Sequence, residues 1–324
     1  MALLEVRDLE LAIAAGGRLL PVVRGISFAV EENETLGIVG ESGCGKSLTA
    51  LAIMGLLEDT AIRITGGSIR FEGRELLTMA PAERRSLMGN RMAIVFQEPM
   101  TSLNPVYRVG DQIVEVLRQH RQLSASEARE RAVRLLQMVR VPEPEQRVDS
   151  YPHQLSGGQR QRVMIAMAIA CDPRLLIADE PTTALDVTVQ KEILELLQDL
   201  QKRMGSAIVL ISHDLGVIAE TCDRVAVMYR GTIVEEATGE ELFANVAHPY
   251  TRGLLASIPS ADRDVEWLEA IPGRVPAIDQ EIPGCAFHPR CAFARDPCHS
   301  RDPEARSFAP GHLLRCHFPQ EWRK

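Results

Sequence analysis

The sequence predicts an α/β fold with a small C-terminal extension. Apolar runs rich in β-branched residues indicate buried strands at residues 35–40, 92–97, 174–179 and 206–212. Segments with helical spacing lie between them, at residues 109–120, 125–139 and 188–204. From about residue 245 the periodicity fades while Pro, Gly, Cys and His become frequent. We therefore expect an α/β core that carries an appended module.

Size and charge narrow the class of protein. A chain of 324 residues suits a core with additions. The net charge of −8 argues against DNA or RNA as the main partner, because phosphate backbones need a basic face. No signal-peptide pattern opens the sequence, and no charge-free stretch approaches the ~20 residues of a spanning helix. We expect a cytoplasmic chain that reaches a membrane only through partners.

The remaining elements follow in chain order. Residues 3–30 predict short β segments around a glycine turn, and residues 66–76 predict an edge hairpin. Charged helical segments follow, with another helix from about Ser156, and residues 224–237 predict a second hairpin around a glycine. The expected division is a core with an antiparallel β part (1–97), a helical subdomain (98–170), the rest of the core (171–245) and the extension (246–324).

A glycine-rich loop between a strand and a helix carries the clearest chemistry. Residues 40–47 read GESGCGKS, which fits G-x4-G-K-S. Glycines let backbone N–H groups converge on phosphate oxygens, and the following helix directs its positive end at the same anion. Lys46 is expected to neutralise β- and γ-phosphate charge, and Ser47 to bind Mg2+. The candidate nucleotide-binding residues of the loop are Gly40, Glu41, Ser42, Gly43, Cys44, Gly45, Lys46, Ser47 and Leu48.

Two further segments complete the candidate site. A buried strand ends in Asp179 and Glu180, which places Asp179 for Mg2+ and Glu180 to orient or deprotonate an attacking water. Alone, this acid pair would fit a helix cap equally well. Ser156, Gly157, Gly158 and Gln159 open a helix and offer a hydroxyl and N–H groups to a second anion. An isolated segment of this kind would more often be an ordinary N-cap.

The order of these motifs resembles the ATP-binding-cassette (ABC) ATPases over residues 1–240. LSGGQ (155–159) is similar to the family's signature motif, and ALD (184–186), with Asp186, resembles its D-loop. Gln97 resembles the Q-loop glutamine that links Mg2+ and water to a membrane partner, and His213 the switch histidine that contacts the γ-phosphate. The resemblance implies a P-loop NTPase cassette with a RecA-like core, an antiparallel β subdomain and a helical subdomain.

One position departs from the family pattern. The family usually has an aromatic residue near position 13 that stacks on adenine, and this chain has Ile13. Adenine would then rest on apolar surface, with about 1 kcal/mol of stacking lost.

Four longer segments narrow the resemblance to the dipeptide/oligopeptide importer branch, specifically its D-type ATPase: EPMTSLNP (98–105), YPHQLSGGQ (151–159), ADEPTTALDVTVQ (178–190) and HPYTRGLLASIP (248–259). The resemblance to this branch implies a peripheral subunit on the cytoplasmic face of a bacterial membrane. The implied partners are a second ABC ATPase, two permease subunits and an extracytoplasmic binding protein. ATP would be held between this P-loop and the partner's signature helix, with Glu180 and His213 acting in hydrolysis.

Four of the seven cysteines fall in the last 40 residues. Cys285, Cys291, Cys298 and Cys316 are spaced more widely than most zinc ligands. Spacing and family resemblance both favour a [4Fe–4S] cluster, with zinc or simply buried thiols as the alternatives. Four nearby histidines are expected to be solvated or to lie behind the ligands: His288, His299, His312 and His317. Cys171 and Cys222 are expected to be small buried residues.

Three alternatives to a peptide importer remain open. The first is the ATPase of a nickel or other small-solute importer, whose comparable subunit usually lacks the long extension. The second is a non-transport ABC ATPase, which usually needs a coiled-coil insert or two cassettes in one chain. The third is a regulatory module that only binds nucleotide, which the presence of Glu180 and His213 disfavours.

Overall fold

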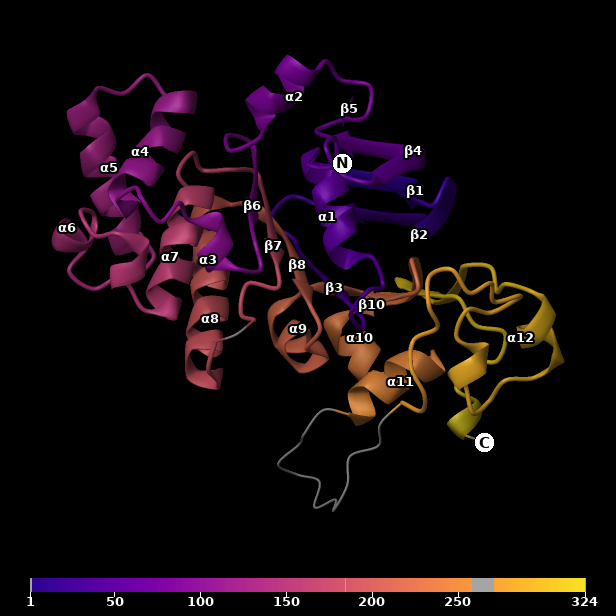
Figure 1. Ribbon diagram of the computed structural model, residues 1–324. Helices are drawn as coiled ribbons and strands as arrows, with labels where there is room; N and C mark the ends of the chain where they lie inside the picture. The colour runs from indigo at the N-terminus through magenta and orange to yellow at the C-terminus, as the bar shows by residue number, and fades with distance from the viewer. Residues whose placement is uncertain (1, 184, 258–270, 324) are drawn as a thin grey trace. The chain divides into compact units, whose positions relative to one another are not determined.

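The computed structural model describes residues 2–183, 185–257 and 271–323 (Figure 1). The chain divides into two compact units. The first unit comprises Met1–Leu4, Val30–Glu34 and Phe71–Ile211. The second unit comprises Glu5–Ala29, Thr35–Arg70 and Ser212–Lys324.

The first unit contains a parallel sheet and a group of helices. The strand order is β8-β7-β6, with bounds Met92–Val95 (β6), Leu175–Asp179 (β7) and Ala207–Ser212 (β8), whose last residue belongs to the second unit. All five residues of β7 are buried, as expected for a strand covered on both faces. The helices are α2 (Pro81–Leu87), α3 (Pro99–Ser102), α4 (Val109–His120), α5 (Ala125–Met138), α6 (Pro144–Arg147), α7 (Gly157–Ala168) and α8 (Val187–Met204), and the short strand β5 is Arg74–Glu75.

Local sequence explains where these helices begin. Ser124 caps α5 by accepting a hydrogen bond from the Glu127 N–H, while the Glu127 carboxylate accepts one from the Ser124 N–H. The buried residues of α5 recur at helical spacing: Ala128, Ala132, Leu135 and Leu136. This apolar stripe packs against α4 and α7, which form the magenta helical group of Figure 1 with α5.

The second unit is built on strands β11-β12-β10-β9-β3 in that order. Their bounds are Thr35–Val39 (β3), Arg224–Tyr229 (β9), Thr232–Thr238 (β10), Arg306–Ala309 (β11) and His312–Leu314 (β12). Strand β3 pairs in parallel with β9, whereas β9, β10, β12 and β11 pair antiparallel. A further sheet has the order β2-β1-β4, with bounds Leu4–Ala15 (β1), Arg18–Val30 (β2) and Ile62–Phe71 (β4). The helices are α1 (Lys46–Met54), α9 (Leu215–Thr221), α10 (Gly239–Ala244), α11 (Pro249–Ala256) and α12 (Asp296–Ser300).

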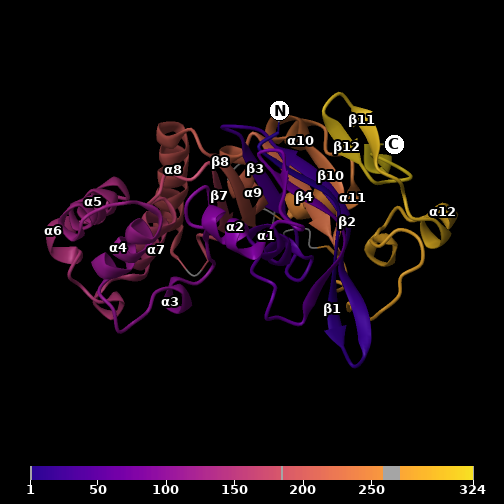
Figure 2. The ribbon, with the colours of Figure 1, turned by 90° about the horizontal axis from the view of Figure 1, so that it is seen from above.

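The C-terminal extension is more regular than the sequence indicated. Where the sequence showed only fading periodicity, the extension adds the hairpin β11–β12 beside β10 (Figure 2). In this pairing Glu235 lies opposite Leu314. The predicted short β segments at the N-terminus are two long strands of 12 and 13 residues. The helices that were not predicted are α2, α3, α6, α9, α10, α11 and α12. Among the described residues, none of the helices combines the length and apolar character needed to cross a bilayer.

A buried polar network joins the extension to β10. Glu235 is fully buried and accepts hydrogen bonds from the N–H groups of Ala247 (2.6 Å) and His248 (3.1 Å). Its carboxylate also lies 2.9 Å from Nε2 of His312, which is itself fully buried. The expectation that His312 is solvated is therefore wrong, because a strand that pairs with β10 carries this ring into the interior. Burial lowers the pKa of His312, but the hydrogen bonds and charges of Glu235 and Glu241 together outweigh it and raise the pKa overall.

We predict that acid destabilises the protein between pH 6.5 and pH 4 through His248. Burial lowers the pKa of His248 to about 4, so the ring stays neutral in the fold but gains a proton in the unfolded chain. The unfolded state binds more protons in this window, so stability falls as the pH falls. The shift corresponds to about 3 kcal/mol, measurable by urea unfolding at several pH values.

The matched variant is His248→Asn, because Asn can still cap α11 but does not titrate. Its stability should change with pH by about 3 kcal/mol less than that of the wild type over the same range. His312 is present in both proteins and cancels in the comparison. Equal pH dependence of the two proteins would contradict the prediction.

Candidate functional site

The phosphate loop occupies residues 40–47 between β3 and α1, in the second unit. Gly45 precedes α1 with φ of +105°, a conformation that glycine adopts without strain. No side chain caps this helix N-terminus, and its first turn holds no acidic residue. Its N–H groups are thus suited to bind an anion. A Cβ at Gly40 would lie 2.1 Å from the Met228 carbonyl oxygen, so only glycine fits there.

Lys46 is held inside the loop. The residue is 4% exposed, and its Nζ donates to the carbonyl oxygens of Gly40 (2.7 Å) and Glu41 (3.3 Å). These bonds hold the ammonium group against the loop backbone, where an arriving phosphate can exchange for a carbonyl partner. Within the loop, Ser42 and Gly43 are exposed. Ser47 and Leu48 are half-buried at the start of α1.

Cys44 contributes to the loop through its backbone. Its side chain is 2% exposed, and burial raises the pKa of its thiol. Its carbonyl accepts a hydrogen bond of 3.0 Å from the Gly231 N–H at the β9–β10 turn. The Cys44 side chain is packed under the loop, so only its backbone can face a ligand.

The predicted carboxylates belong to the first unit. Asp179 is the last residue of β7 and is 6% exposed. Glu180 follows with φ of +44°, an unfavourable conformation for a residue with a side chain. Its carboxylate accepts hydrogen bonds from Nε2 of Gln97 (3.0 Å) and from the hydroxyl of Thr183 (2.9 Å). The structure thus brings Gln97 and Glu180 together, and adds Thr183, which sequence analysis missed.

The predicted second anion site lies at the N-terminus of α7. The Ser156 hydroxyl accepts a hydrogen bond from the Gln159 N–H (3.3 Å), and the Gln159 side-chain oxygen accepts one from the Ser156 N–H (3.0 Å). This capping box explains both residues by local structure alone. Ser156 and Gly157 are nonetheless exposed, so the helix start remains accessible to a partner.

The remaining predicted residues lie in or beside other elements. Asp186 is exposed and caps α8 by accepting a hydrogen bond of 3.0 Å from the Val189 N–H. His213 is exposed and directly follows β8. Ile13 is half-buried in β1.

All seven cysteines are free thiols, and Cys171 and Cys222 are buried as expected. In the extension, burial raises the pKa of Cys285 to about 11 and that of Cys316 to about 12. Neighbouring cysteines raise the pKa of Cys285, Cys291 and Cys316 further. The backbone also joins two of these segments, since the Cys285 N–H donates to the Cys298 carbonyl (2.9 Å). Over the residues that the structure describes, no group of three or more His, Cys, Asp or Glu side chains is arranged to hold a metal ion.

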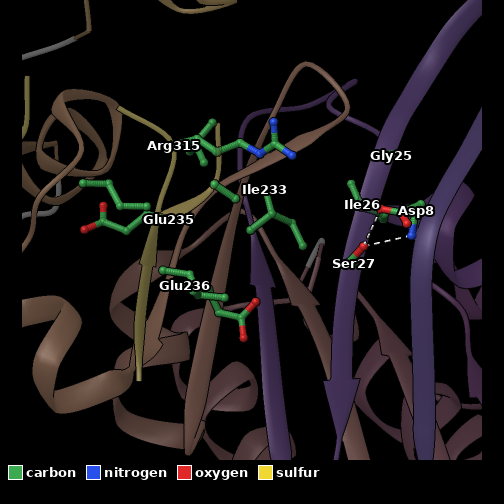
Figure 3. A pocket seen from close by; sticks show the side chains of 12 residues that line it. Asp8, Gly25, Ile26, Ser27, Ile233, Glu235, Glu236 and Arg315 are labelled. Atoms are coloured by element: carbon green, nitrogen blue, oxygen red, sulfur yellow. Dashed lines mark hydrogen bonds between the residues drawn. The ribbon is translucent and has the colours of Figure 1, made fainter. Parts of the chain in front are cut away.

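A cavity of about 220 Å³ lies elsewhere in the second unit (Figure 3). Asp8 and Ser27 face each other on one wall, where the Ser27 hydroxyl accepts from the Asp8 N–H (2.8 Å) and donates to its carboxylate (3.1 Å). Glu235, Glu236 and Arg315 lie on the other side. None of its lining residues is among the predicted nucleotide ligands, so this cavity is not the candidate site.

Two family models match the chain. One, described as "ABC transporter", covers residues 23–183, and one described as "Oligopeptide/dipeptide transporter, C-terminal region" covers residues 234–298. The oligopeptide transport ATP-binding protein AppD of Bacillus subtilis is 49% identical over 98% of this chain and 97% of its own. The chain belongs to the family of ABC transporter ATP-binding proteins. Within that family it falls in the oligopeptide/dipeptide branch, as the sequence predicted.

Other relatives of this ABC ATP-binding protein are also named for peptide transport. A probable peptide ABC transporter ATP-binding protein of Sinorhizobium fredii is 50% identical over 97% of this chain and 94% of its own. The dipeptide transport ATP-binding protein DppD of Escherichia coli is 47% identical over 98% of this chain and 97% of its own.

Solved structures confirm the ABC cassette fold. A dimeric, post-hydrolysis structure of the cassette MJ0796 bound to ADP and Pi has a TM-score of 0.65 and 28% identity, over 72% of this chain and 98% of that one. The structure of cbiO1 from Clostridium perfringens, part of the ABC transporter complex cbiONQ, has a TM-score of 0.64 and 28% identity. This match covers 75% of this chain and 91% of that one.

We predict that Gly40→Ala weakens nucleotide binding by the ABC ATP-binding protein. The new Cβ would overlap the Met228 carbonyl oxygen, so the loop must shift and lose at least one charged hydrogen bond to phosphate. We expect the Kd for Mg-ADP to rise about tenfold or more, measured by calorimetric titration. Gly16→Ala is the control, because Gly16 also has a positive φ (+56°) but open space around it. Equal affinities of the two variants would contradict the prediction.

Proposed function

We propose that this ABC ATP-binding protein powers the import of dipeptides or oligopeptides. Its ATPase role follows from its family, and the observation that carries the peptide assignment is the match of residues 234–298 to the oligopeptide/dipeptide C-terminal region. Relatives named for peptide transport that are 47–50% identical over nearly the whole chain support the same cargo.

The roles of the site residues form part of the proposal. The loop at residues 40–47 cradles the phosphates through its N–H groups, and Lys46 balances their charge. Ser47 offers its hydroxyl and Asp179 its carboxylate to Mg2+. Glu180 accepts a proton from the attacking water, which Gln97 helps to hold, since these two side chains are hydrogen-bonded. His213 contacts the γ-phosphate.

The partners and location are also proposed. The exposed start of α7, at Ser156 and Gly157, supplies N–H groups to the nucleotide of a second ABC ATPase, and that subunit does the same in return. A related sibling chain forms this heterodimer, beneath two permease subunits that receive cargo from an extracytoplasmic binding protein. The chain lies at the cytoplasmic face of a bacterial membrane. The expected four-part division of the chain likewise stays a prediction.

We predict that Glu180→Gln traps an ATP-bound dimer. The substitution keeps the shape that binds Gln97 and Thr183 but removes the base, so hydrolysis should fall about 100-fold or more while Mg-ATP still binds. Phosphate release and size-exclusion chromatography with the sibling chain and permeases would measure both effects. Turnover near the wild-type rate in the assembled complex would overturn the assignment of Glu180.

The cargo is tested in the assembled transporter. Stimulation of ATPase activity by a binding protein loaded with a dipeptide or oligopeptide supports peptide import. Stimulation by Ni2+ instead would move the chain to the nickel importers. ATPase activity that is full without any membrane subunit would favour a non-transport ABC ATPase.

A second proposal concerns the extension, where Cys285, Cys291, Cys298 and Cys316 hold a [4Fe–4S] cluster, with zinc as the alternative. What supports it is the donor set, four free thiols within one extension whose soft sulfur atoms suit such a cluster. Such a group would cross-link the extension. Because the thiols must lose protons and burial raises the pKa of three of them, binding should strengthen as the pH rises.

We predict about four iron atoms per chain after anaerobic purification, together with a brown colour. Iron and zinc assays, with an absorption spectrum, would measure this. Cys298→Ser should remove most of the metal, whereas Cys222→Ser, at a buried thiol outside the extension's set, should retain it. Iron-free, zinc-free protein from anaerobic cells would leave the thiols as buried residues only.

A further inference from the structure

Glu41, the second residue of the phosphate loop, forms an ion pair with an arginine of the C-terminal extension. Both oxygens of the Glu41 carboxylate accept hydrogen bonds from Arg290, at 2.6 Å to Nη1 and 3.0 Å to Nη2. The two residues are 249 positions apart in sequence. This is the paired geometry in which a guanidinium binds a carboxylate most strongly and with a fixed orientation.

The side chain of Arg290 is also held by contacts other than the one with Glu41. The residue is 7% exposed and ends a short 3-10 helix, His288–Arg290, between two of the extension's cysteines. Its Nε donates to the carbonyl of Pro272 (2.9 Å), and its guanidinium lies 5.9 Å from the centre of the Tyr229 ring. Because these contacts hold the side chain in place, little rotamer freedom is lost when it binds Glu41.

An aromatic cluster supports the same contact. Rings of Tyr229, Tyr250 and Phe287 lie 4.7–5.3 Å apart between centres, in a chain whose aromatic content is only 4%. Tyr229 and Tyr250 are fully buried. The Tyr250 hydroxyl accepts a hydrogen bond of 2.9 Å from the Glu41 N–H. A rare group of large rings is thus gathered behind one residue of the phosphate loop.

Glu41 is consequently held at three points. Arg290 holds its carboxylate, Tyr250 its N–H and Lys46 its carbonyl, the last at 3.3 Å. Lys46 at the same time donates to Gly40, at the entrance of the loop. The position of the lysine that meets phosphate is therefore linked, through one residue, to the extension.

We propose that Arg290 is a positioning residue for the nucleotide: by holding Glu41 it keeps the phosphate loop in the conformation that binds Mg-ATP. The inference rests on the proposed nucleotide role of residues 40–47. It makes the extension part of the nucleotide site, and it gives Glu41 a role as a structural link instead of a direct ligand. All residues involved belong to the second unit.

Calorimetric titration of the full-length chain with Mg-ADP tests the proposal without turnover. Arg290→Met removes the paired hydrogen bonds and should raise the Kd about tenfold, because Glu41 is partly exposed and water recovers part of the loss. Glu41→Gln should have a similar effect. The double variant should bind no more weakly than either single variant, since both break one interaction. Arg290→Lys keeps the charge but not the paired geometry, and should fall between wild type and Arg290→Met.

The control is Arg295→Met, the same change at an exposed arginine of the extension that pairs with Glu321. Its Kd should match that of the wild type. In the assembled transporter, Arg290→Met should raise the KM for ATP about tenfold while kcat changes by less than about twofold, a split that general misfolding would not produce. Should Arg290→Met fail to fold, Arg290→Lys and Glu41→Gln provide the same test.

Two results would overturn the inference. One is a Kd for Arg290→Met within about twofold of Arg295→Met, and the other is a double variant in which the single effects multiply. Lys46→Ala separates this failure from that of the proposed function. If Lys46→Ala abolishes Mg-ADP binding but the Arg290 variants match the control, only the role of Arg290 fails. If Lys46→Ala has no effect, the nucleotide role of the loop fails as well.

Discussion

One proposed interaction underlies our account of the second unit, the binding of a polyphosphate by the uncapped N-terminus of α1. The N–H groups of this turn point outward because Gly45 adopts a positive φ and no side chain caps the helix. Lys46 adds the positive charge that the backbone dipoles lack. Most other features can be understood as support for this anion site. The Gly231 N–H of the β9–β10 turn donates to the Cys44 carbonyl of the loop, and Glu41 ties the loop to the extension.

Two of the contacts between the extension and the rest of the second unit join segments far apart in sequence. One is strand pairing, in which β12 lengthens the sheet beside β10 and buries the Glu235–His312 pair. The other is the contact between Arg290 and Glu41. An extension joined to the rest of the chain only by a flexible linker would need neither the strand pairing nor the ion pair. Buried ion pairs contribute less to stability than their number suggests, but they define which segments must meet.

Local signals explain what the sequence predicted well. Helix α4 has the predicted bounds, and the loop, the buried strands and the acid pair follow from short-range patterns in glycine, β-branched and charged residues. Contacts between distant segments were not predictable. Nothing near Arg290 or His312 in sequence indicates a partner 249 or 77 positions away. Thr183 is only three positions from Glu180, but no pattern in the sequence indicated the turn that brings its hydroxyl to the carboxylate. Strands β11 and β12 were missed because the apolar periodicity fades in the extension.

The most direct test of the central claim compares ATP with AMP in binding to the wild-type chain. Both carry the same base, and Ile13 offers no aromatic surface for stacking, so binding should depend on the β- and γ-phosphates. In calorimetric titrations with Mg2+, the account predicts that AMP binds at least ~100-fold more weakly than ATP, since two or more charged hydrogen bonds are lost. Affinities of ATP and AMP within a few-fold of each other would contradict it.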